Sequence, residues 1–426
     1  MATLLYDITK RCNLECKHCY NSNYFKDKDI DNSAKSVIEF VKLNNISHVH
    51  ILGGEPLLSE QLWYFIDNTL NSITISINTN GTLLNYDNIC KVLSRKKINQ
   101  LTISIDGHNE DTNAIIRGKG VFDIILKNTK ILNDLKNKYN SKLKINMAFV
   151  NTPNNVESLS KLALLAKQNN FDRILVSFLY YEGASKINLN LNYNYQKVIN
   201  NLLILIEKSR KFNIELLLDV KPIFLKLMEL KSSNPDIKFN TKTIPCYANI
   251  SYYYISANNE LYPCSPSSKF GGKFMICDLK KENHKLINKL DVVFSNNRNE
   301  LCLKCKYSSN CHSCPLNIEC SQYDMCNYAL NEINKKTSAI LNKKILRNSN
   351  YEIKVREQKL TLVNFKLNKT CILCETCVKL EIIDLNKIYD LTLLELFNYI
   401  CDKKDSVDDF LFNVLSSKNK NMINLE

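Results

Sequence analysis

Short runs of β-branched and other apolar residues alternate with longer amphipathic stretches over the first 180 residues. The apolar runs predict strands at residues 3–8, 46–52, 72–78, 98–105, 143–150 and 171–179. The stretches between them repeat apolar residues at helical spacing, at 33–44, 59–70, 86–95, 121–138 and 154–169. Strands that alternate with helices predict an α/β fold whose parallel sheet carries helices on its outer face. Six such strands suit an open, partial (β/α)6 barrel of the TIM type.

The pattern changes after this repeat. We expect a helical bridge with one strand at 214–219, then a β-hairpin over the aromatic run 250–261, which is broken at Asn258-Asn259. Two strand-like runs and two amphipathic helices follow, at 351–366, 377–384, 391–401 and 406–415. The predicted divisions are 1–185, 186–240, 241–335 and an α+β extension at 340–426.

Composition excludes several classes of protein. The chain has 426 residues, 45% hydrophobic and 23% charged, as soluble globular proteins have. No apolar run is long enough to span a membrane and no signal peptide precedes the first strand, so we expect a cytoplasmic protein without a membrane partner. Seventeen cysteines then favour metal or redox use over disulfides. The net charge of +14 comes from scattered lysines, which favours a solvated basic surface over nucleic-acid binding.

Three cysteines follow the first predicted strand within twelve residues. Cys12, Cys16 and Cys19 form a C-x3-C-x2-C array. Three thiolates on one loop can hold three irons of a 4Fe–4S cube and leave the fourth iron open to a small molecule. A structural zinc site needs four ligands, and His18 lies awkwardly between two of the cysteines for that purpose. Zinc or free thiols remain the alternatives.

This array resembles that of the radical S-adenosylmethionine (radical SAM) enzymes, in which aromatic residues such as His18 and Tyr20 often neighbour the last cysteine. The resemblance implies that the open iron is chelated by the amino and carboxylate groups of SAM. It also implies that one electron, from a flavodoxin or ferredoxin, cleaves SAM to a 5′-deoxyadenosyl radical.

A second motif follows the second predicted strand, Gly53-Gly54-Glu55-Pro56. Two glycines allow a close backbone approach, and a carboxylate can accept a hydrogen bond from an ammonium group. Taken alone, this sequence is an ordinary loop. Its place after the cysteine array resembles the GGEP element of the radical SAM family, which binds the amino group of SAM.

Further polar residues end the third and fourth strands. Asn80 lies in a turn signal, and Ser104, Asp106 and Arg117 follow the pattern S-x-D-G and R-G. The resemblance implies that Ser104 and Asp106 lie near the ribose of SAM. It places Arg117 near the carboxylate of SAM or the substrate. Helix capping is the alternative for Asp106.

Eight cysteines form a second set. They are Cys246, Cys264, Cys302, Cys305, Cys311, Cys314, Cys320 and Cys326. Eight thiolates fill two four-ligand sites, and spacing does not separate iron–sulfur from zinc.

The order of this set resembles the SPASM domain, which holds two auxiliary 4Fe–4S clusters in peptide- and protein-modifying radical SAM enzymes. By position, the first auxiliary cluster takes Cys246, Cys264 and Cys314. The second cluster takes Cys302, Cys305, Cys311 and Cys326. Cys320 is a fourth ligand or a spare. The spacing between Cys311 and Cys314 is shorter than usual, and asparagine replaces the glycine of the hairpin, which puts its turn in doubt.

The last segment allows two interpretations. Cys371, Cys374, Cys377 and Cys401 could bind a further metal or stay free thiols. The order of strands and helices is faintly similar to the winged-helix elements that bind leader peptides, and a helical cap is the alternative.

The combined resemblance implies a radical SAM/SPASM maturase that abstracts hydrogen from a ribosomally made precursor peptide. A thioether or a carbon–carbon crosslink could result. The alternatives are a peptide epimerase, a maturase that acts on a protein, as in anaerobic sulfatase maturation, and a cofactor-forming enzyme. A zinc-binding structural protein is the non-enzymatic alternative, and it would be colourless.

The first prediction concerns iron. Anaerobically reconstituted protein should be brown and hold about twelve irons if three clusters form. Changing Cys12, Cys16 and Cys19 together to Ala should remove about four irons and abolish SAM cleavage. Metal analysis that finds zinc and no iron uptake would refute the cluster assignment.

Overall fold

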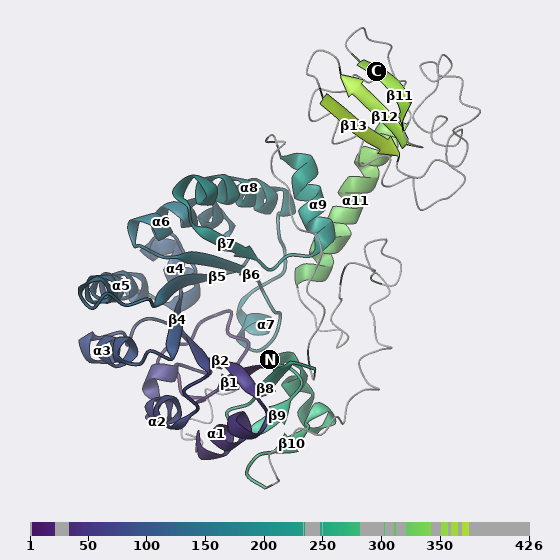
Figure 1. Cartoon of the computed structure of the whole chain (residues 1–426). Helices are drawn as coiled ribbons and strands as arrows, with labels where there is room; N and C mark the ends of the chain where they lie inside the picture. The colour runs from purple at the N-terminus through teal and green to yellow at the C-terminus, as the bar shows by residue number, and fades with distance from the viewer. Residues whose placement is uncertain are drawn as a thin grey trace. The chain divides into compact units, whose positions relative to one another are not determined.

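The computed structural model describes most of the first 281 residues and parts of the remainder (Figure 1). The described residues are 2–21, 34–232, 234, 248, 250–281, 302, 311, 321–341, 351–356, 359–364 and 369–374. The chain divides into two compact units. Unit 1 combines Met1–Val220 with Thr243–Asp324, and unit 2 combines Lys221–Lys242 with Met325–Glu426.

A ten-stranded sheet forms the centre of unit 1, in the order β10-β9-β8-β1-β2-β3-β4-β5-β6-β7. Its strands are β1 (Ala2–Asp7), β2 (Ile46–Leu52), β3 (Thr74–Thr79), β4 (Ile98–Ser104), β5 (Lys144–Asn151), β6 (Arg173–Phe178), β7 (Glu215–Leu218), β8 (Tyr252–Ile255), β9 (Glu260–Tyr262) and β10 (Cys277–Asp278). Strands β1 to β7 are parallel to their neighbours. The predicted α/β fold with a parallel sheet is confirmed.

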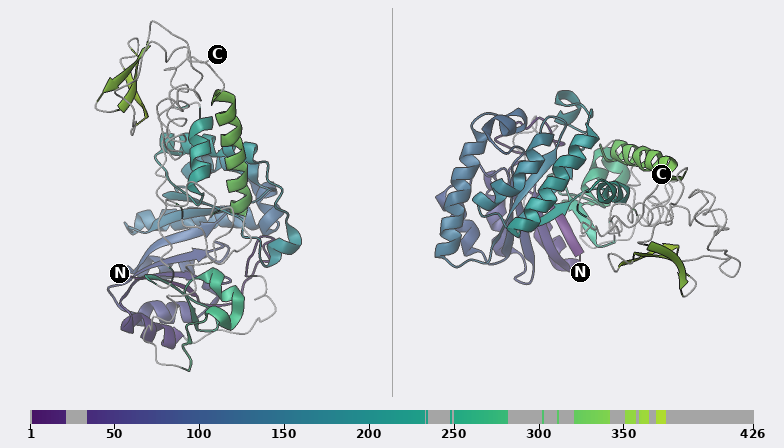
Figure 2. Two further views of the ribbon diagram at one scale, coloured as in Figure 1. Left: turned by 90° about the vertical axis from the view of Figure 1, so that its right-hand side faces the viewer. Right: turned by 90° about the horizontal axis from the view of Figure 1, so that it is seen from above.

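Helices follow the parallel strands and lie on the outer face of the sheet (Figure 2). They are α1 (Ala34–Leu43), α2 (Gln61–Asn68), α3 (Tyr86–Ser94), α4 (Glu110–Arg117), α5 (Val121–Lys138), α6 (Leu162–Gln168) and α8 (Tyr195–Phe212). Short helical segments also occur in the connections, namely α7 (Ala184–Asn188) and the 3-10 turns η2 (Pro56–Leu58), η3 (Val156–Lys161) and η4 (Ser265–Phe274).

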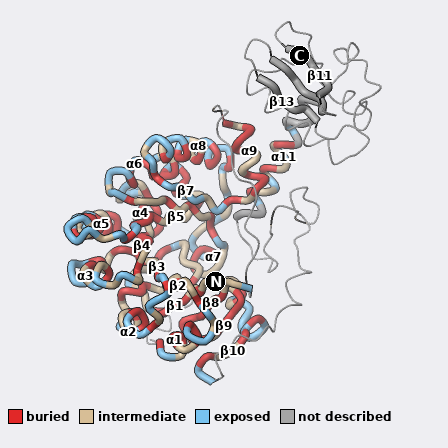
Figure 3. Tube along the Cα trace, in the orientation of Figure 1, coloured by how far each residue is buried: buried red, intermediate tan, exposed pale blue. Residues whose placement is uncertain are grey.

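The core lies between these two layers, as the buried segments in Figure 3 show. Alternate strand residues such as Ile51, Ile77 and Ile103 are fully buried. Because side chains of a strand alternate between its faces, the residues between them point to the inner side of the curved sheet. That inner side is rich in polar groups, for example His50, which bonds Asn78 across β2 and β3.

Helix α4 was not predicted. Its sequence is mostly polar, and three adjacent apolar residues do not produce a helical period. The helix starts at Asn109, whose side chain accepts a hydrogen bond from the backbone amide of Thr112, while the Thr112 side chain reaches back to the Asn109 amide. This reciprocal cap satisfies amides that a helix start leaves open.

Both edges of the predicted six-stranded array carry further strands. The strand expected at 214–219 is β7, which pairs with β6. At the other edge β8 runs parallel to β1 and antiparallel to β9, so the predicted hairpin is confirmed. Its turn forms without glycine because Asn259 adopts a φ of 64°. Asparagine tolerates this left-handed region better than most residues do.

The described part of unit 2 contains helices and a small sheet. Its elements are α9 (Pro222–Lys231), α11 (Ser321–Leu341), β11 (Tyr351–Arg356), β12 (Lys359–Asn364) and β13 (Lys369–Cys374). The first four residues of α11 are assigned to unit 1, and the helix belongs to unit 2 from Met325 onward. Lys231 Nζ lies 2.9 Å from Glu332 Oε2 and so ties α9 to α11. Among the helices of the described ranges, none has the length and apolarity needed to cross a membrane.

The first strand-like run of the predicted extension forms two strands, β11 and β12, which pair antiparallel. Cys371 and Cys374 lie on β13. The rest of the predicted extension lies outside the described residues. This covers the predicted strand 377–384, the two predicted helices, Cys377 and Cys401.

Candidate functional site

A pocket of about 360 Å³ opens at the carboxyl ends of the parallel strands. This is where ligands bind in parallel α/β folds, and the volume suits a small molecule. Its lining includes most of the predicted site residues, namely Cys12, Cys16, Cys19, Gly53, Gly54, Asn80, Ser104 and Arg117. The side chains of Glu55, Pro56 and Asp106 are buried behind this lining.

The cysteine loop (residues 9–20) is held by the backbone of the Gly-Gly motif. The amide of Gly54 donates to the carbonyl of Thr9 at 2.8 Å, and the amide of Glu55 donates to that of Arg11 at 2.7 Å. A Cβ atom on Gly54 would lie 2.1 Å from the Arg11 carbonyl oxygen. Gly53 has a φ of 134°, which also favours glycine. The two glycines are therefore needed for this close approach.

Two other segments, helix α4 and the residues after β6, hold the cysteine loop through its backbone. Ile116, in α4, accepts a hydrogen bond from the Lys17 amide at 2.9 Å. After β6, the Ala184 amide donates to the Cys19 carbonyl at 2.9 Å, and a Cβ on Gly183 would lie 2.6 Å from the Tyr20 carbonyl. Gly183 was not singled out from the sequence. The chain has only nine glycines, and this rarity of glycine was the one signal that could have drawn attention to Gly183.

Glu55 joins the ends of β2 and β3. Its carboxylate accepts hydrogen bonds from the Thr79 hydroxyl at 2.7 Å, the Asn80 amide at 2.7 Å and the Leu57 amide at 3.1 Å. Burial raises the pKa of Glu55, and these donors act against the rise. Asn80 in turn donates from its side chain to Asn13 at 2.9 Å. The expected contact between Glu55 and the ammonium group of SAM stays a prediction.

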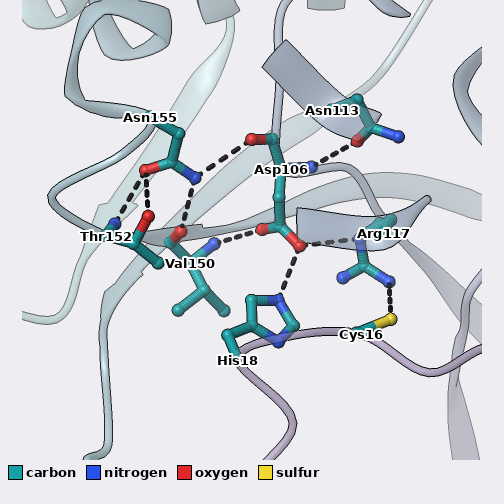
Figure 4. Close-up of polar contacts among 8 residues, drawn as sticks. All are labelled: Cys16, His18, Asp106, Asn113, Arg117, Val150, Thr152 and Asn155. Carbon is teal, nitrogen blue, oxygen red and sulfur yellow. Dashed lines mark hydrogen bonds and ion pairs between the residues drawn. The ribbon is translucent and has the colours of Figure 1, made fainter. Parts of the chain in front are cut away.

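Asp106 stands at the centre of a buried polar network (Figure 4). Its Oδ2 lies 2.6 Å from His18 Nε2 and 2.6 Å from Arg117 Nε, and its Oδ1 accepts from the Val150 amide at 2.8 Å. Burial alone would raise the pKa of Asp106, but the charge of Arg117 and the contact with His18 outweigh it and lower the pKa to about 2. Asp106 is therefore ionised. Its expected place near the ribose stays a prediction.

A second buried carboxylate, Asp7, links the hairpin to the cysteine loop. The Tyr254 hydroxyl donates to Asp7 Oδ2 at 2.6 Å, and the Asn21 side chain donates to the same oxygen at 3.2 Å. Lys269, from η4, donates to Asn21 Oδ1 at 2.9 Å and to the Tyr20 carbonyl at 3.1 Å. Sequence reasoning missed this network because Tyr254 and Lys269 lie 247 to 249 positions away from their partners.

The three cysteines of the array all line the pocket. Burial raises the pKa of Cys12 to about 11 and that of Cys19 to about 12, so these thiols need a bound cation to ionise. In the part of the chain that the structure describes, no three His, Cys, Asp or Glu side chains converge closely enough for a single metal ion. In a cluster each thiolate binds a different iron, so three cysteines that line one pocket without meeting at one point fit that group.

The second cysteine set is described only in part. Cys264 is the N-cap residue of η4 and lies directly after the hairpin. Cys302, Cys311 and Cys326 lie within the described residues, and the other four lie outside them, namely Cys246, Cys305, Cys314 and Cys320. Cys277, which was not among the predicted ligands, pairs with Leu261 on β9, three residues before Cys264. The assignment of auxiliary ligands stays a prediction.

Comparisons with known proteins identify the first part of the chain. Residues 6–163 match the radical SAM superfamily, so the chain contains a radical SAM domain. Mycofactocin maturase MftC of Mycolicibacterium smegmatis is 30% identical over 166 residues, 38% of this chain and 41% of that protein. Fe-coproporphyrin III synthase of Methanosarcina barkeri is 26% identical over 220 residues, 49% of this chain and 52% of that protein. The chain thus spans about half the length of these relatives.

A longer match and two solved structures extend the likeness. AdoMet-dependent heme synthase of Methanosarcina barkeri is 23% identical over 329 residues, 73% of this chain and 90% of that protein. Streptococcus suis SuiB bound to S-adenosylmethionine aligns with a TM-score of 0.57 at 18% identity, over 73% of this chain and 72% of SuiB. The structure of anSMEcpe with AdoMet and the Cp18Cys peptide aligns at 0.53 and 18% identity, over 78% and 97%. The fold is therefore shared with these structures.

The Gly54 contact predicts a steric effect. Gly54→Ala should prevent the cysteine loop from closing, because the new Cβ would clash with backbone that has no room to move. Overpacking of this kind costs about 1–3 kcal/mol. We expect a lower melting temperature and a loss of about four irons per chain on reconstitution. Gly272→Ala is the matched control, since nothing lies within 4 Å of its Cβ position. Equal iron content in both variants would contradict the steric argument.

Asp7 predicts a pH dependence of stability. Burial raises its pKa to about 6, while the hydrogen bond from Tyr254 opposes the rise. The folded state thus binds the proton more tightly than the unfolded state, and stability is lost as pH rises from about 4 to 6. The loss is on the order of 2 kcal/mol between pH 4.5 and 7. Asp7→Asn should therefore gain stability relative to the unchanged chain as pH rises. A difference in melting temperature that does not vary with pH would show that Asp7 does not titrate in this window.

Proposed function

We propose that this protein is a radical SAM enzyme that modifies a ribosomally made precursor peptide. When bound, the cluster and SAM supply a 5′-deoxyadenosyl radical, which would abstract hydrogen from a residue of the peptide. The observation that carries the proposal is the cysteine loop, whose three thiols face a cofactor-sized pocket at the carboxyl ends of the strands. The chain's own residues fix this loop, enclose the pocket and orient what binds there.

The peptide substrate is supported by the related structures. SuiB was solved with its precursor peptide SuiA, and anSMEcpe was solved with a bound peptide. MftC is named a maturase. These likenesses are distant, so the substrate of this chain is part of the proposal.

The remaining assignments complete this proposal. Residues 1–185 would form the partial barrel, 186–240 the bridge and 241–335 a SPASM-type domain with two auxiliary clusters. A thioether is the favoured product, because an auxiliary cluster can accept an electron or ligate a substrate thiolate. A flavodoxin or ferredoxin in the cytoplasm would donate the electron, drawn by the net charge of +14.

The extension at 340–426 would recognise the leader of the peptide. Strands β11, β12 and β13 form an antiparallel sheet with two edges. An extended peptide can add to a sheet edge through main-chain hydrogen bonds, which tolerate varied leader sequences.

A cofactor-forming enzyme is the second candidate. The match to AdoMet-dependent heme synthase favours it, because that match covers 73% of this chain and 90% of that protein. The substrate would then be a porphyrin. No described residue decides between a peptide and a porphyrin.

The two candidates predict different products. Reconstituted protein should be incubated anaerobically with SAM, a reductant and a short peptide encoded beside its gene. We expect 5′-deoxyadenosine and a peptide that has lost two hydrogen atoms, as a thioether or carbon–carbon crosslink requires. An epimerised peptide would keep its mass in water and gain deuterium in heavy water.

The control is the chain with Cys12, Cys16 and Cys19 changed to Ala, which should form neither product. Consumption of an iron porphyrin, with the peptide unchanged, would replace the peptide proposal by the second candidate. A chain that binds iron and SAM but forms no 5′-deoxyadenosine with any reductant would contradict both.

A further inference from the structure

Arg117 is the last residue of α4, and its guanidinium group points toward the cysteine loop (Figure 4). Its Nη1 lies 3.8 Å from Cys16 Sγ, and its Nε lies 2.6 Å from Asp106 Oδ2. Arg117 and Cys16 are each 8% exposed, and Asp106 is fully buried. A buried cation thus lies between a buried carboxylate and a cysteine of the array.

Asp106 is fixed on every side by groups other than Arg117. Its amide donates to Asn113 Oδ1 at 2.9 Å, and its carbonyl accepts from Asn155 Nδ2 at 3.0 Å. Its Oδ1 accepts from the Val150 amide, and its Oδ2 contacts His18, which lies between the cysteines. The carboxylate therefore holds one orientation, and the fully buried Asp106 does not line the pocket.

We propose that Arg117 is a positioning residue that supplies a positive charge to the Cys16 thiolate, and that Asp106 and His18 hold it in place. The proposal rests on the cluster that the radical SAM domain implies. Reduction adds one electron, and so one negative charge, to that cluster. Hydrogen bonds to cluster sulfurs and nearby charge set the reduction potential. A guanidinium that donates to Cys16 makes this electron easier to accept.

Two features favour a role of Arg117 in compensating the charge of the Cys16 thiolate over a role in binding SAM. Desolvation opposes an isolated buried cation, so the ion pair with Asp106 is what allows Arg117 to stay charged at this depth. Besides Nε, which faces Asp106, the guanidinium uses Nη1, which donates to the sulfur of Cys16. Arg117 also lines the pocket, however, so a direct contact with the carboxylate of SAM is the competing interpretation.

The test compares Arg117→Met, which removes the charge, with Arg117→Lys, which keeps it. The midpoint potential is measured in the full-length protein by redox titration of the EPR signal that SAM addition perturbs, which separates this cluster from others. SAM affinity and iron content are measured in parallel. Arg95→Met is the matched control, because Arg95 pairs with Asp67 at the surface, away from the pocket.

We expect Arg117→Met to shift the midpoint potential to more negative values, with SAM affinity within about twofold of the unchanged chain. Arg117→Lys should lie between the two potentials, and Arg95→Met should match the unchanged chain. If Arg117→Met cannot assemble the cluster, it should lack about four irons that Arg117→Lys retains, which supports the proposal equally.

Three outcomes overturn the proposal. The first is an unchanged potential together with weakened SAM binding, which would make Arg117 a SAM ligand. The second is a loss of iron in both variants, which would show that charge is not what the loop needs. The third is an unchanged potential with unchanged SAM affinity. If the unchanged chain takes up no iron at all, the proposed function itself fails, and that result is distinct from these three.

Discussion

The structure of the site depends on close contacts between the backbone of the cysteine loop and the backbone of neighbouring segments. Three thiolates can bind three irons of one cube only if the loop that carries them keeps a single conformation. That conformation is fixed by backbone hydrogen bonds at Thr9, Arg11, Lys17 and Cys19. The partners come from the Gly-Gly motif after β2, from helix α4 after β4 and from the residues after β6. At three of these contacts, those with Thr9, Arg11 and Cys19, a side chain would not fit, so glycine is required beside them.

This arrangement explains why the buried charges of the site lie behind the pocket. Glu55 and Asp106 are both fully buried. Glu55 accepts from Thr79 and Asn80 at the end of β3. Asp106 accepts from the Val150 amide on β5 and contacts His18 and Arg117. A buried charge that loses its partner is strongly destabilising, whereas a satisfied one fixes a geometry. These carboxylates therefore act as ties between adjacent loops, and the loops in turn hold the thiols. The position of each cysteine is determined by residues far from it in the sequence.

The periodicity of the sequence was sufficient to predict the layers of the fold. It was not sufficient to predict the hydrogen bonds that join the loops of the site. Alternation and helical spacing located β1 to β6 and most helices because packing against one core imposes those periods. Helix α4 has too few apolar residues to show a period. The Gly-Gly motif was found by resemblance, but its reason, the 2.1 Å clash at Gly54, exists only in three dimensions. His18 was noted as an aromatic neighbour of the cysteines, and its bond to Asp106 across 88 positions could not be predicted.

The hairpin extends the same logic to the second cysteine region. Strand β8 pairs with β1, the strand that leads into the cysteine loop, in register from Thr3 to Tyr6. The Tyr254 hydroxyl then bonds Asp7, and Lys269 reaches the carbonyl of Tyr20, one residue after Cys19. A change in the conformation of η4, which Cys264 caps, would therefore disturb hydrogen bonds beside the first cysteine array. The two regions share one sheet and one set of polar contacts, so any ligand that orders Cys264 also affects the residues next to Cys19.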